Sequence, residues 1–205
     1  MRAIAVALLF SLLLSGCASP AEEEPASTSQ EPPQEETMQA ALVESAARPL
    51  LEAEVLDAYE RALRIYGWFD LSPLPSTEET VSLEGRVYRR VNMEGIQDLE
   101  DLRAYLRSVF SQELTARLLD GESTRIHYRN IGGALYVCGE RRNRAAGKGM
   151  IQMESEQLDE TTYFVNLLAE LLDEDGETVV GLESWSFPYV FEDDRWVFTD
   201  FRLIY

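Results

Sequence analysis

Residues 161–205 read TTYFVNLLAELLDEDGETVVGLESWSFPYVFEDDRWVFTDFRLIY, and this stretch decides the fold class. The segment Thr161 to Leu172 fits a helix by its leucines and a long strand by its length. Its neighbours favour the strand, because Asp173 to Glu177 is typical of a hairpin turn and Val179 to Phe191 would pair with it. A second acidic turn leads into an aromatic strand, Trp196 to Tyr205. The stretch therefore predicts a meander of long antiparallel strands.

Helices are predicted upstream of this meander. Between Arg48 and Phe69, apolar residues recur every three or four positions and give one apolar helix face. These positions are Leu51, Val55, Tyr59, Ala62 and Tyr66. Asp98 is an expected N-cap of a second helix, and Ser111 of a third that stops at Asp120-Gly121.

Shorter strands are predicted at residues 85–91, 125–128, 134–138 and 150–153. Helices first and a curved antiparallel sheet afterwards make an α+β domain, with the helices packed on one sheet face. This arrangement resembles the cone-like, nuclear-transport-factor-like superfold, whose last strand often carries an aromatic run like Trp196 to Phe201 here. The superfold hosts enzymes, binders and interaction domains, so it implies no single function.

The N-terminus has the layout of an export signal. Met1-Arg2 precedes an apolar run, residues 3–14, that is too short to span a bilayer comfortably as a helix. Leu14-Ser15-Gly16-Cys17 resembles the lipobox of bacterial lipoproteins. We therefore predict a signal peptide, residues 1–16, lipid on Cys17, and a location on the outer face of the cytoplasmic membrane. The alternative is an ordinary secretory signal followed by a chance cysteine.

Composition divides the remaining chain at about residue 45. Residues 17–45 are rich in Pro, Glu, Ser and Gln, and we expect an acidic, disordered linker because they offer little to bury. Residues 46–205 suffice for one globular domain. The formal net charge of −19 argues against nucleic acid and anionic lipid surfaces, and suits either solubility or a basic partner. Beyond Cys17 the chain has one cysteine, Cys138, so an intramolecular disulfide is not expected in the mature domain.

Residues with catalytic chemistry are few. His127 and Cys138 lie on neighbouring predicted strands, so the histidine could reach the thiol, although core packing is the alternative for both. One histidine and one free cysteine cannot supply a zinc site, and residues 173–177 fail the spacing of a calcium loop. No cofactor motif is recognised. The sequence therefore shows no recognisable catalytic constellation.

Two groups of residues are candidates for contact with a partner. The first is a basic segment in an otherwise acidic chain, which is either a solvated hairpin tip or a recognition loop. It comprises Arg141, Arg142, Arg144 and Lys148. The second is Trp68 and Phe69 at a predicted helix end, which would anchor a partner if exposed and otherwise pack in the core.

A series of motifs in this order resembles the DL-endopeptidase inhibitor family of bacterial cell-wall regulators, the IseA type. The motifs are Tyr66-Gly67-Trp68-Phe69, Pro73, Tyr88-Arg89-Arg90-Val91, Ile96-Gln97-Asp98-Leu99, Leu102-Arg103-Ala104-Tyr105-Leu106, Phe110-Ser111-Gln112-Glu113-Leu114, Gly133-Ala134-Leu135-Tyr136-Val137 and an arginine–glycine loop. The resemblance covers about residues 46–149, and the meander by general character. None of the motifs is catalytic.

The resemblance implies a non-enzymatic plug that binds NlpC-type cysteine peptidases and restrains their cutting of peptidoglycan stem peptides. The partner would then be a cell-wall DL-endopeptidase, and the protein would meet the membrane through Cys17. The long acidic linker departs from a freely secreted inhibitor. Two alternatives stay open: a lipoprotein that binds a small ligand or wall fragment in a cone-fold pocket, and an enzyme using His127, Cys138 or carboxylates.

Overall fold

The computed structural model describes residues 47–121, 124–143 and 147–204. All of them belong to one compact unit, Leu42–Tyr205. In chain order the elements are α2 (Glu52–Tyr66), the 3-10 helix η1 (Gly67–Phe69), β1 (Ser76–Leu83), β2 (Arg86–Val91), α3 (Leu99–Arg107), α4 (Gln112–Asp120), β3 (His127–Ile131), β4 (Ala134–Cys138), β5 (Lys148–Asp159), β6 (Thr162–Leu172), β7 (Val179–Glu192) and β8 (Arg195–Phe198). The predicted α+β class is confirmed.

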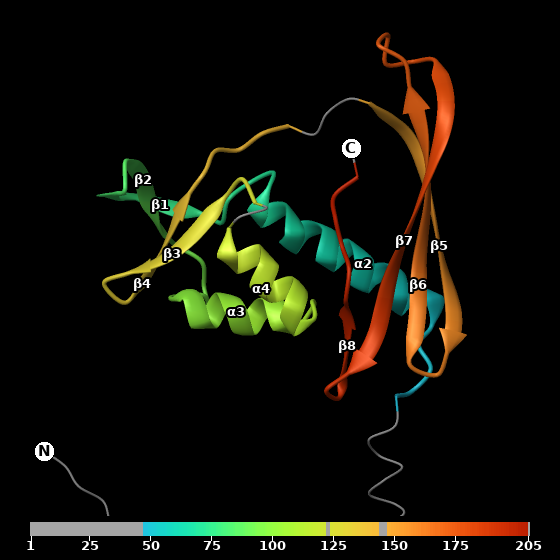
Figure 1. Cartoon of the computed structure of the whole chain (residues 1–205), viewed down its shortest axis with the longest axis horizontal. Coiled ribbons are helices and arrows are strands. Elements are labelled where there is room, and N and C mark those ends of the chain that lie inside the picture. Colours follow the sequence, from blue (N-terminus) through green and yellow to red (C-terminus); the bar gives the residue numbers. More distant parts are fainter. Residues whose placement is uncertain (1–46, 122–123, 144–146, 205) are drawn as a thin grey trace, which may run out of the picture. The chain divides into compact units, whose positions relative to one another are not determined.

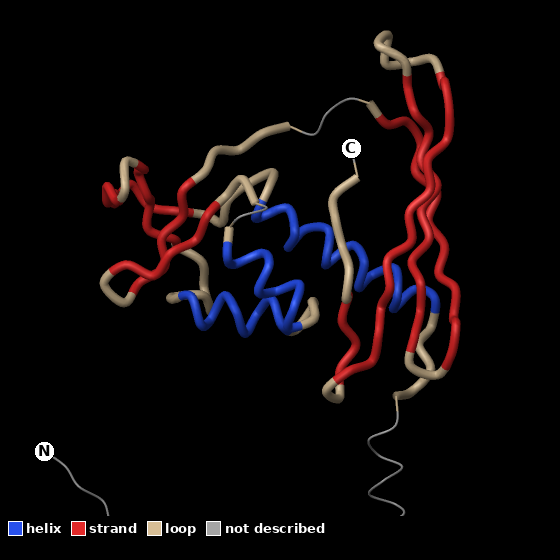
Figure 2. The backbone as a smooth tube through the Cα atoms, viewed as in Figure 1, coloured by secondary structure: helices blue, strands red, loops and turns tan. Residues whose placement is uncertain are grey.

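The strands form two antiparallel sheets rather than one curved sheet (Figure 1). Sheet 1 has the order β1-β2-β4-β3, and sheet 2 has the order β5-β6-β7-β8. The chain leaves sheet 1 after β4 through a crossover, whose described residues 139–143 run as loop (Figure 2). The predicted meander is therefore sheet 2 by itself, and the shorter strands build a separate sheet. The nuclear-transport-factor-like likeness stays a prediction.

The ambiguous segment Thr162–Leu172 is a strand, as its neighbours indicated. Its odd-numbered side chains Tyr163, Val165 and Leu167 are buried, while the residues between them are more exposed. β6 and β7 pair over nearly their full length, with Leu167 opposite Trp185. The last strand is shorter than expected, because β8 ends at Phe198 and residues 199–204 continue as irregular chain.

Helix α2 begins at Glu52, four residues later than the predicted start. Its first turn is held by Glu54, which accepts a hydrogen bond from the Leu51 N–H at 2.9 Å. Both predicted N-caps are confirmed. Asp98 Oδ1 accepts from the backbone of Glu100 and Asp101 at 2.9 Å, and Ser111 Oγ accepts from Leu114 N at 3.2 Å.

Strand β1 was assigned to no element from the sequence. Its residues STEETVSL are mostly exposed, so the apolar alternation that would predict a half-buried strand is missing. The hairpin to β2 turns at Glu84 and Gly85, whose φ angles are 52° and 76°. Positive φ at both central residues is the geometry of a two-residue type I′ hairpin, which matches the twist of the flanking strands.

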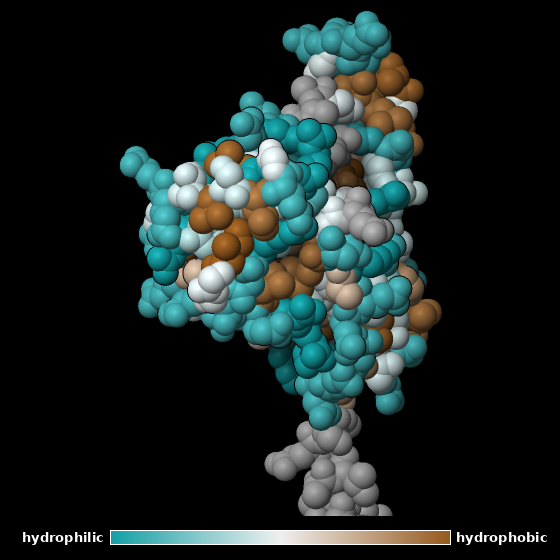
Figure 3. All heavy atoms as spheres, turned by 60° about the vertical axis from the view of Figure 1, so that its left-hand side comes forward, coloured by the Kyte–Doolittle hydropathy of each residue, from teal (hydrophilic) through white to brown (hydrophobic). Residues whose placement is uncertain are grey.

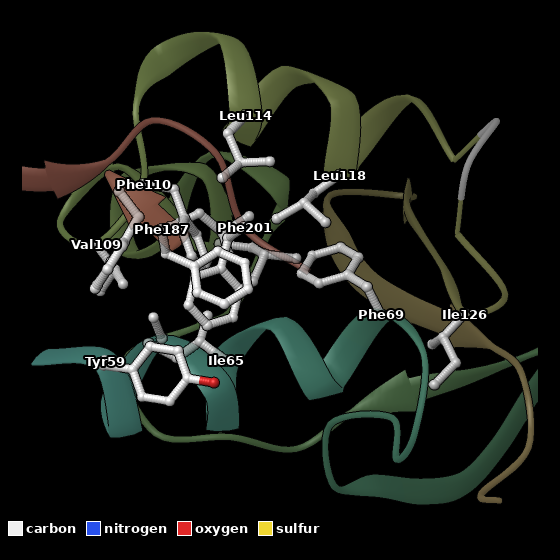
Figure 4. Packing of buried hydrophobic residues seen from close by; sticks show 14 of the residues in the cluster. Tyr59, Ile65, Phe69, Val109, Phe110, Leu114, Leu118, Ile126, Phe187 and Phe201 are labelled. Atoms are coloured by element: carbon white, nitrogen blue, oxygen red, sulfur yellow. The ribbon is translucent and has the colours of Figure 1, made fainter. Parts of the chain in front are cut away.

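Aromatic rings fill the core between α2, α4 and sheet 2 (Figure 4). Phe201 is 2% exposed and lies at the centre of these rings. Its ring centroid is 5.0–5.8 Å from those of Tyr59, Tyr66, Phe110, Phe187 and Phe198. Burying a ring of this size contributes about 1.5–3 kcal/mol, and tilted ring pairs add to it. Side chains therefore occupy the space in which a cone-shaped fold would enclose a ligand.

Across the described residues, no helix combines the length and the apolar character needed to span a membrane.

Candidate functional site

A surface groove brings together residues from both predicted contact groups. It measures about 560 Å³ and runs between the end of α2 with η1, the proline-containing loop 71–75, and the crossover. We call it the basic groove. Its lining comprises Leu63, Arg64, Gly67, Trp68, Leu71, Ser72, Pro73, Pro75, Arg141, Arg142 and Asn143. Trp68, Arg141 and Arg142 are thus neighbours in space, although all of sheet 1 and helices α3 and α4 separate Trp68 from the two arginines in the sequence.

The short helix η1 sets the orientation of Trp68 and Phe69. The Phe69 carbonyl accepts hydrogen bonds from Arg125 N at 3.1 Å and Ile126 N at 3.0 Å, which ties η1 to the two residues just before β3. Phe69 is 1% exposed and packs edge-on against Tyr128 at 5.1 Å. Trp68 is half-buried, and its ring is tilted against that of Tyr105, with the ring centroids 5.4 Å apart. A partner can therefore reach Trp68, whereas the prediction that Phe69 is also an anchor is wrong because the core buries it.

Tyr128 joins the two sides of this turn through its hydroxyl. The hydroxyl donates to the Trp68 carbonyl at 3.0 Å and accepts from Leu74 N at 3.0 Å. Burial raises the pKa of Tyr128, so the hydroxyl stays protonated and keeps its donor role. The backbone on either side of the groove is thereby held at fixed spacing.

Arg142 fastens the crossover to the end of η1. Its backbone N–H donates to the Leu71 carbonyl at 2.8 Å, and its Nε donates to the Asp70 carbonyl at 3.1 Å. Its Nη2 also reaches Asp70 Oδ2 at 2.6 Å, while Arg125 Nε lies 3.9 Å from the other carboxylate oxygen. Arg142 therefore holds the groove together through these contacts, and its contact with a partner stays a prediction.

Arg141 and Arg64 provide the groove's accessible charge. Both are exposed, and within the described ranges neither side chain forms an ion pair or hydrogen bond. Arg64 lies on α2 one helical turn before Trp68, so it reaches the same side of the helix. Guanidinium groups bind carboxylates and phosphates in a two-pronged geometry. Together with the apolar surfaces of Leu63, Trp68 and the prolines, they suit an acidic segment that also carries an apolar side chain.

Lys148 is not part of the groove. Its ammonium group pairs with Glu183 and lies 4.8 Å above the Trp185 ring, and the side chain is 13% exposed. The Lys148 ammonium group is therefore already paired within sheet 2, and its contact with a partner stays a prediction. The remaining two predicted site residues, Cys17 and Arg144, lie outside the described residues.

His127 and Cys138 face each other across strands β3 and β4. Both are half-buried, and no hydrogen bond joins them among the described residues. Burial, with Arg86 and Arg129 nearby, lowers the pKa of His127, so the ring is neutral near pH 7 and provides no positive field for a thiolate. The ring instead packs beside Gly121, where an added Cβ would lie 2.8 Å from Nδ1.

Other hollows have different chemistry. A trough of about 590 Å³ on sheet 2 is lined by polar side chains such as Gln152, Asn166 and Ser184 around Leu168. A crevice of about 260 Å³ lies between α2 and β8. The described part of the chain contains no group of three or more His, Cys, Asp or Glu side chains placed to hold a metal ion.

Compared with known family models and with curated proteins, the chain has no significant match. The residues of the basic groove must therefore be interpreted from their own geometry. Sequence reasoning found Trp68 and the arginine segment separately, but it missed Arg64, Asp70 and Leu71. The spacing of Arg64 and Trp68, one helical turn apart, was the available signal for Arg64.

Proposed function

We propose that this protein is a non-enzymatic binding protein that restrains a peptidoglycan DL-endopeptidase of the NlpC type from the outer face of the cytoplasmic membrane. The observation that carries the proposal is the basic groove. It combines two unpaired arginines with a half-buried tryptophan on a backbone fixed by buried hydrogen bonds. Aromatic and arginine side chains on a fixed scaffold are typical hot spots of protein interfaces.

The filled core supports a protein partner over an enclosed small ligand. Phe201 and the rings around it occupy the position between helices and sheet, and the groove opens at the surface instead. A surface groove with apolar walls and charged rims suits an extended segment of another protein. The resemblance to the inhibitor family suggests which protein this is, and the exported, lipid-tethered state predicted from the N-terminus would place the domain beside the wall.

The charge distribution supports an oriented encounter. The chain carries a net charge of −19, while the groove presents Arg64 and Arg141. A partner with an acidic segment beside a basic surface would be attracted to both regions, and complementary charges speed association and select its orientation. Replacing Arg64 and Arg141 by glutamate should therefore weaken binding of the partner far more than replacing an arginine elsewhere on the surface by glutamate.

A digestion assay tests the proposal. The full-length chain carrying Cys17→Ser, so that it is not lipidated, is added to an NlpC-type DL-endopeptidase digesting peptidoglycan. We expect stoichiometric slowing, and the double variant Arg64→Glu with Arg141→Glu should need about a hundredfold more protein, at about tenfold for each lost charge contact. Arg103→Glu on α3 is the matched control, and this variant should inhibit digestion as strongly as the protein whose groove arginines are unaltered. The absence of slowing at large excess over active enzyme would refute the proposal for that target.

A wall-fragment ligand is the second candidate function, and the polar trough on sheet 2 favours it. Amide, hydroxyl and carboxylate groups gather there, including Asn166, Ser184 and Glu154. These groups hydrogen-bond sugars and peptides. Calorimetric titration with soluble peptidoglycan fragments tests it, and Asn166→Ala should then reduce the affinity, whereas Arg141→Glu should not.

A further inference from the structure

Strand β5 forms an edge of sheet 2 that no other described strand covers. It runs over twelve residues, Lys148–Asp159, and is the outermost strand in the order β5-β6-β7-β8 (Figure 1). It pairs with β6 along one side, and no described strand pairs with the other. The backbone N–H and C=O groups pointing outward therefore lack a strand partner among the described residues. Long edges of this kind are templates for pairing with another strand.

The first half of β5 carries exposed apolar side chains on both faces of the sheet. Ile151 and Met153 lie opposite Ala169 and Leu167, on the face that carries the core, yet they are 38% and 41% exposed. Met150 is 63% exposed. Apolar side chains gather below the polar tip of the β6–β7 hairpin (Figure 3). Leu182 on β7 is also exposed, at 61%. An added strand would bury side chains on both faces as well as pair the backbone.

The charges along β5 restrict how a second copy could pair with it. When two copies pair antiparallel about a two-fold axis, one β5 residue must lie directly opposite the same residue of the other copy. If the register is offset by one residue, the core-packed face of one sheet lies on the opposite side from that of the other sheet. Centring the axis on Glu154 or Glu156 places like charges directly opposite each other. Centring it on Ser155 places Glu154 opposite Glu156 twice. Directly opposed like charges destabilise strand pairing, so these three registers are disfavoured.

We propose that two copies of this chain pair antiparallel through β5, with Gln152 facing Gln152 at the two-fold axis. Sheet 2 of each copy then continues into the other, giving one sheet of eight strands. In this register Ile151 of each copy faces Met153 of the other, so the exposed apolar side chains cover one another twice. Glu154 faces Met150, which is uncharged, and Glu156 faces Lys148, which has the opposite charge, so neither glutamate is opposed by another carboxylate.

The net charge makes this pairing depend on salt. Each chain carries a formal charge of −19, so two copies repel at long range. Salt screens that repulsion over about 8–10 Å at physiological ionic strength, while backbone hydrogen bonds and apolar contacts depend on it much less. The dimer should therefore strengthen as salt rises, which is the opposite of an association driven by opposite charges.

Cysteine cross-linking tests the register. The full-length chain carrying Cys17→Ser and Cys138→Ser has no other cysteine, and Gln152→Cys or Glu156→Cys is added to it. Directly opposite residues have Cα atoms about 4.5–5.5 Å apart, within disulfide range. The two copies of residue 156 would lie eight residues apart along the strands, about 27 Å. We expect mild oxidation to give disulfide-linked dimer with the residue 152 variant and none with the residue 156 variant.

Light scattering on the unoxidised chain provides the second measurement. We expect the mass to double at high concentration and high salt, and Met153→Lys to return it to that of the monomer. Leu182→Lys is the matched control, because it places the same charge on an exposed apolar site of β7 away from the edge, and it should leave the dimer intact. A monomer mass under all conditions, or equal cross-linking at residues 152 and 156, would overturn the proposal.

Discussion

Replacing Phe201 by alanine should remove the central contact of the core. Phe201 is 2% exposed, and its ring lies within 5.8 Å of five other aromatic centroids. Phe→Ala substitutions in cores lower the free energy of unfolding by about 3–5 kcal/mol, through lost burial and the cavity left behind. Because surrounding rings are large and interlocked, we expect little collapse and a loss of about 4 kcal/mol.

Thermal and urea denaturation measure this loss. In a domain of this size, 1 kcal/mol corresponds to about 2–4 °C, so the melting temperature of Phe201→Ala should fall by about 8–16 °C. Phe191→Ala is the matched control, because Phe191 is half-buried and contacts Trp196 near the end of sheet 2. It should lose less than half as much.

The cavity provides an independent check. An apolar cavity lined by rings stays dry and binds small apolar molecules such as benzene. Benzene should therefore raise the melting temperature of Phe201→Ala but leave the unaltered protein unchanged. A loss below about 2 kcal/mol, or a stabilisation of the unaltered protein by benzene, would refute the inference that side chains fill this space.

Three further predictions concern other parts of the fold. Arg142→Ala should lower the free energy of unfolding by only about 1 kcal/mol, because the side chain is one-third exposed. The same substitution should accelerate proteolytic cleavage within the crossover, and gel electrophoresis of the fragments measures this rate. Glu54 should titrate by NMR with a pKa of about 2, because hydrogen bonds from the Arg48 side chain and the Leu51 backbone favour the charged form. The contribution of Glu54 to stability is then complete above pH 4.5 and is lost as the pH falls towards 2. Arg48→Ala should return the pKa of Glu54 towards 4.5. Gly121→Ala should lower the melting temperature more than Gly85→Ala, because both glycines have positive φ but only the first new Cβ would meet a side chain, at 2.8 Å.

Local signals predicted much of the fold. Asp98 and Ser111 cap their helices as expected, because a side-chain oxygen before an apolar periodic segment satisfies free N–H groups. The acidic turn at residues 173–177 correctly decided that β6 is a strand, since leucine content alone favours a helix. These features depend on a few residues that are neighbours in the sequence, so the local sequence is enough to predict them.

The remaining differences come from long-range packing. Strand β1 has no apolar face of its own and is recognisable mainly through its pairing with β2. The division into two sheets depends on which strands pair, and that is set by contacts far apart in the chain. Among the site residues, periodicity could not distinguish Trp68 from Phe69, because their different burial follows from the 3-10 turn. Lys148 was assigned to the basic segment by proximity in sequence, but the start of β5 turns it onto Trp185.

The order of elements along the chain has a consequence for folding kinetics. Tyr59 on α2, near the beginning of the described chain, meets Phe187 and Phe201, near its end, and α2 packs against β5 and β6 rather than against the strands that immediately follow it. A chain emerging N-terminus first from a ribosome or a translocation channel would expose the apolar face of α2 until nearly all of sheet 2 had followed. Such distant contacts slow folding. The delay gives a holding chaperone time to bind the exposed face of α2.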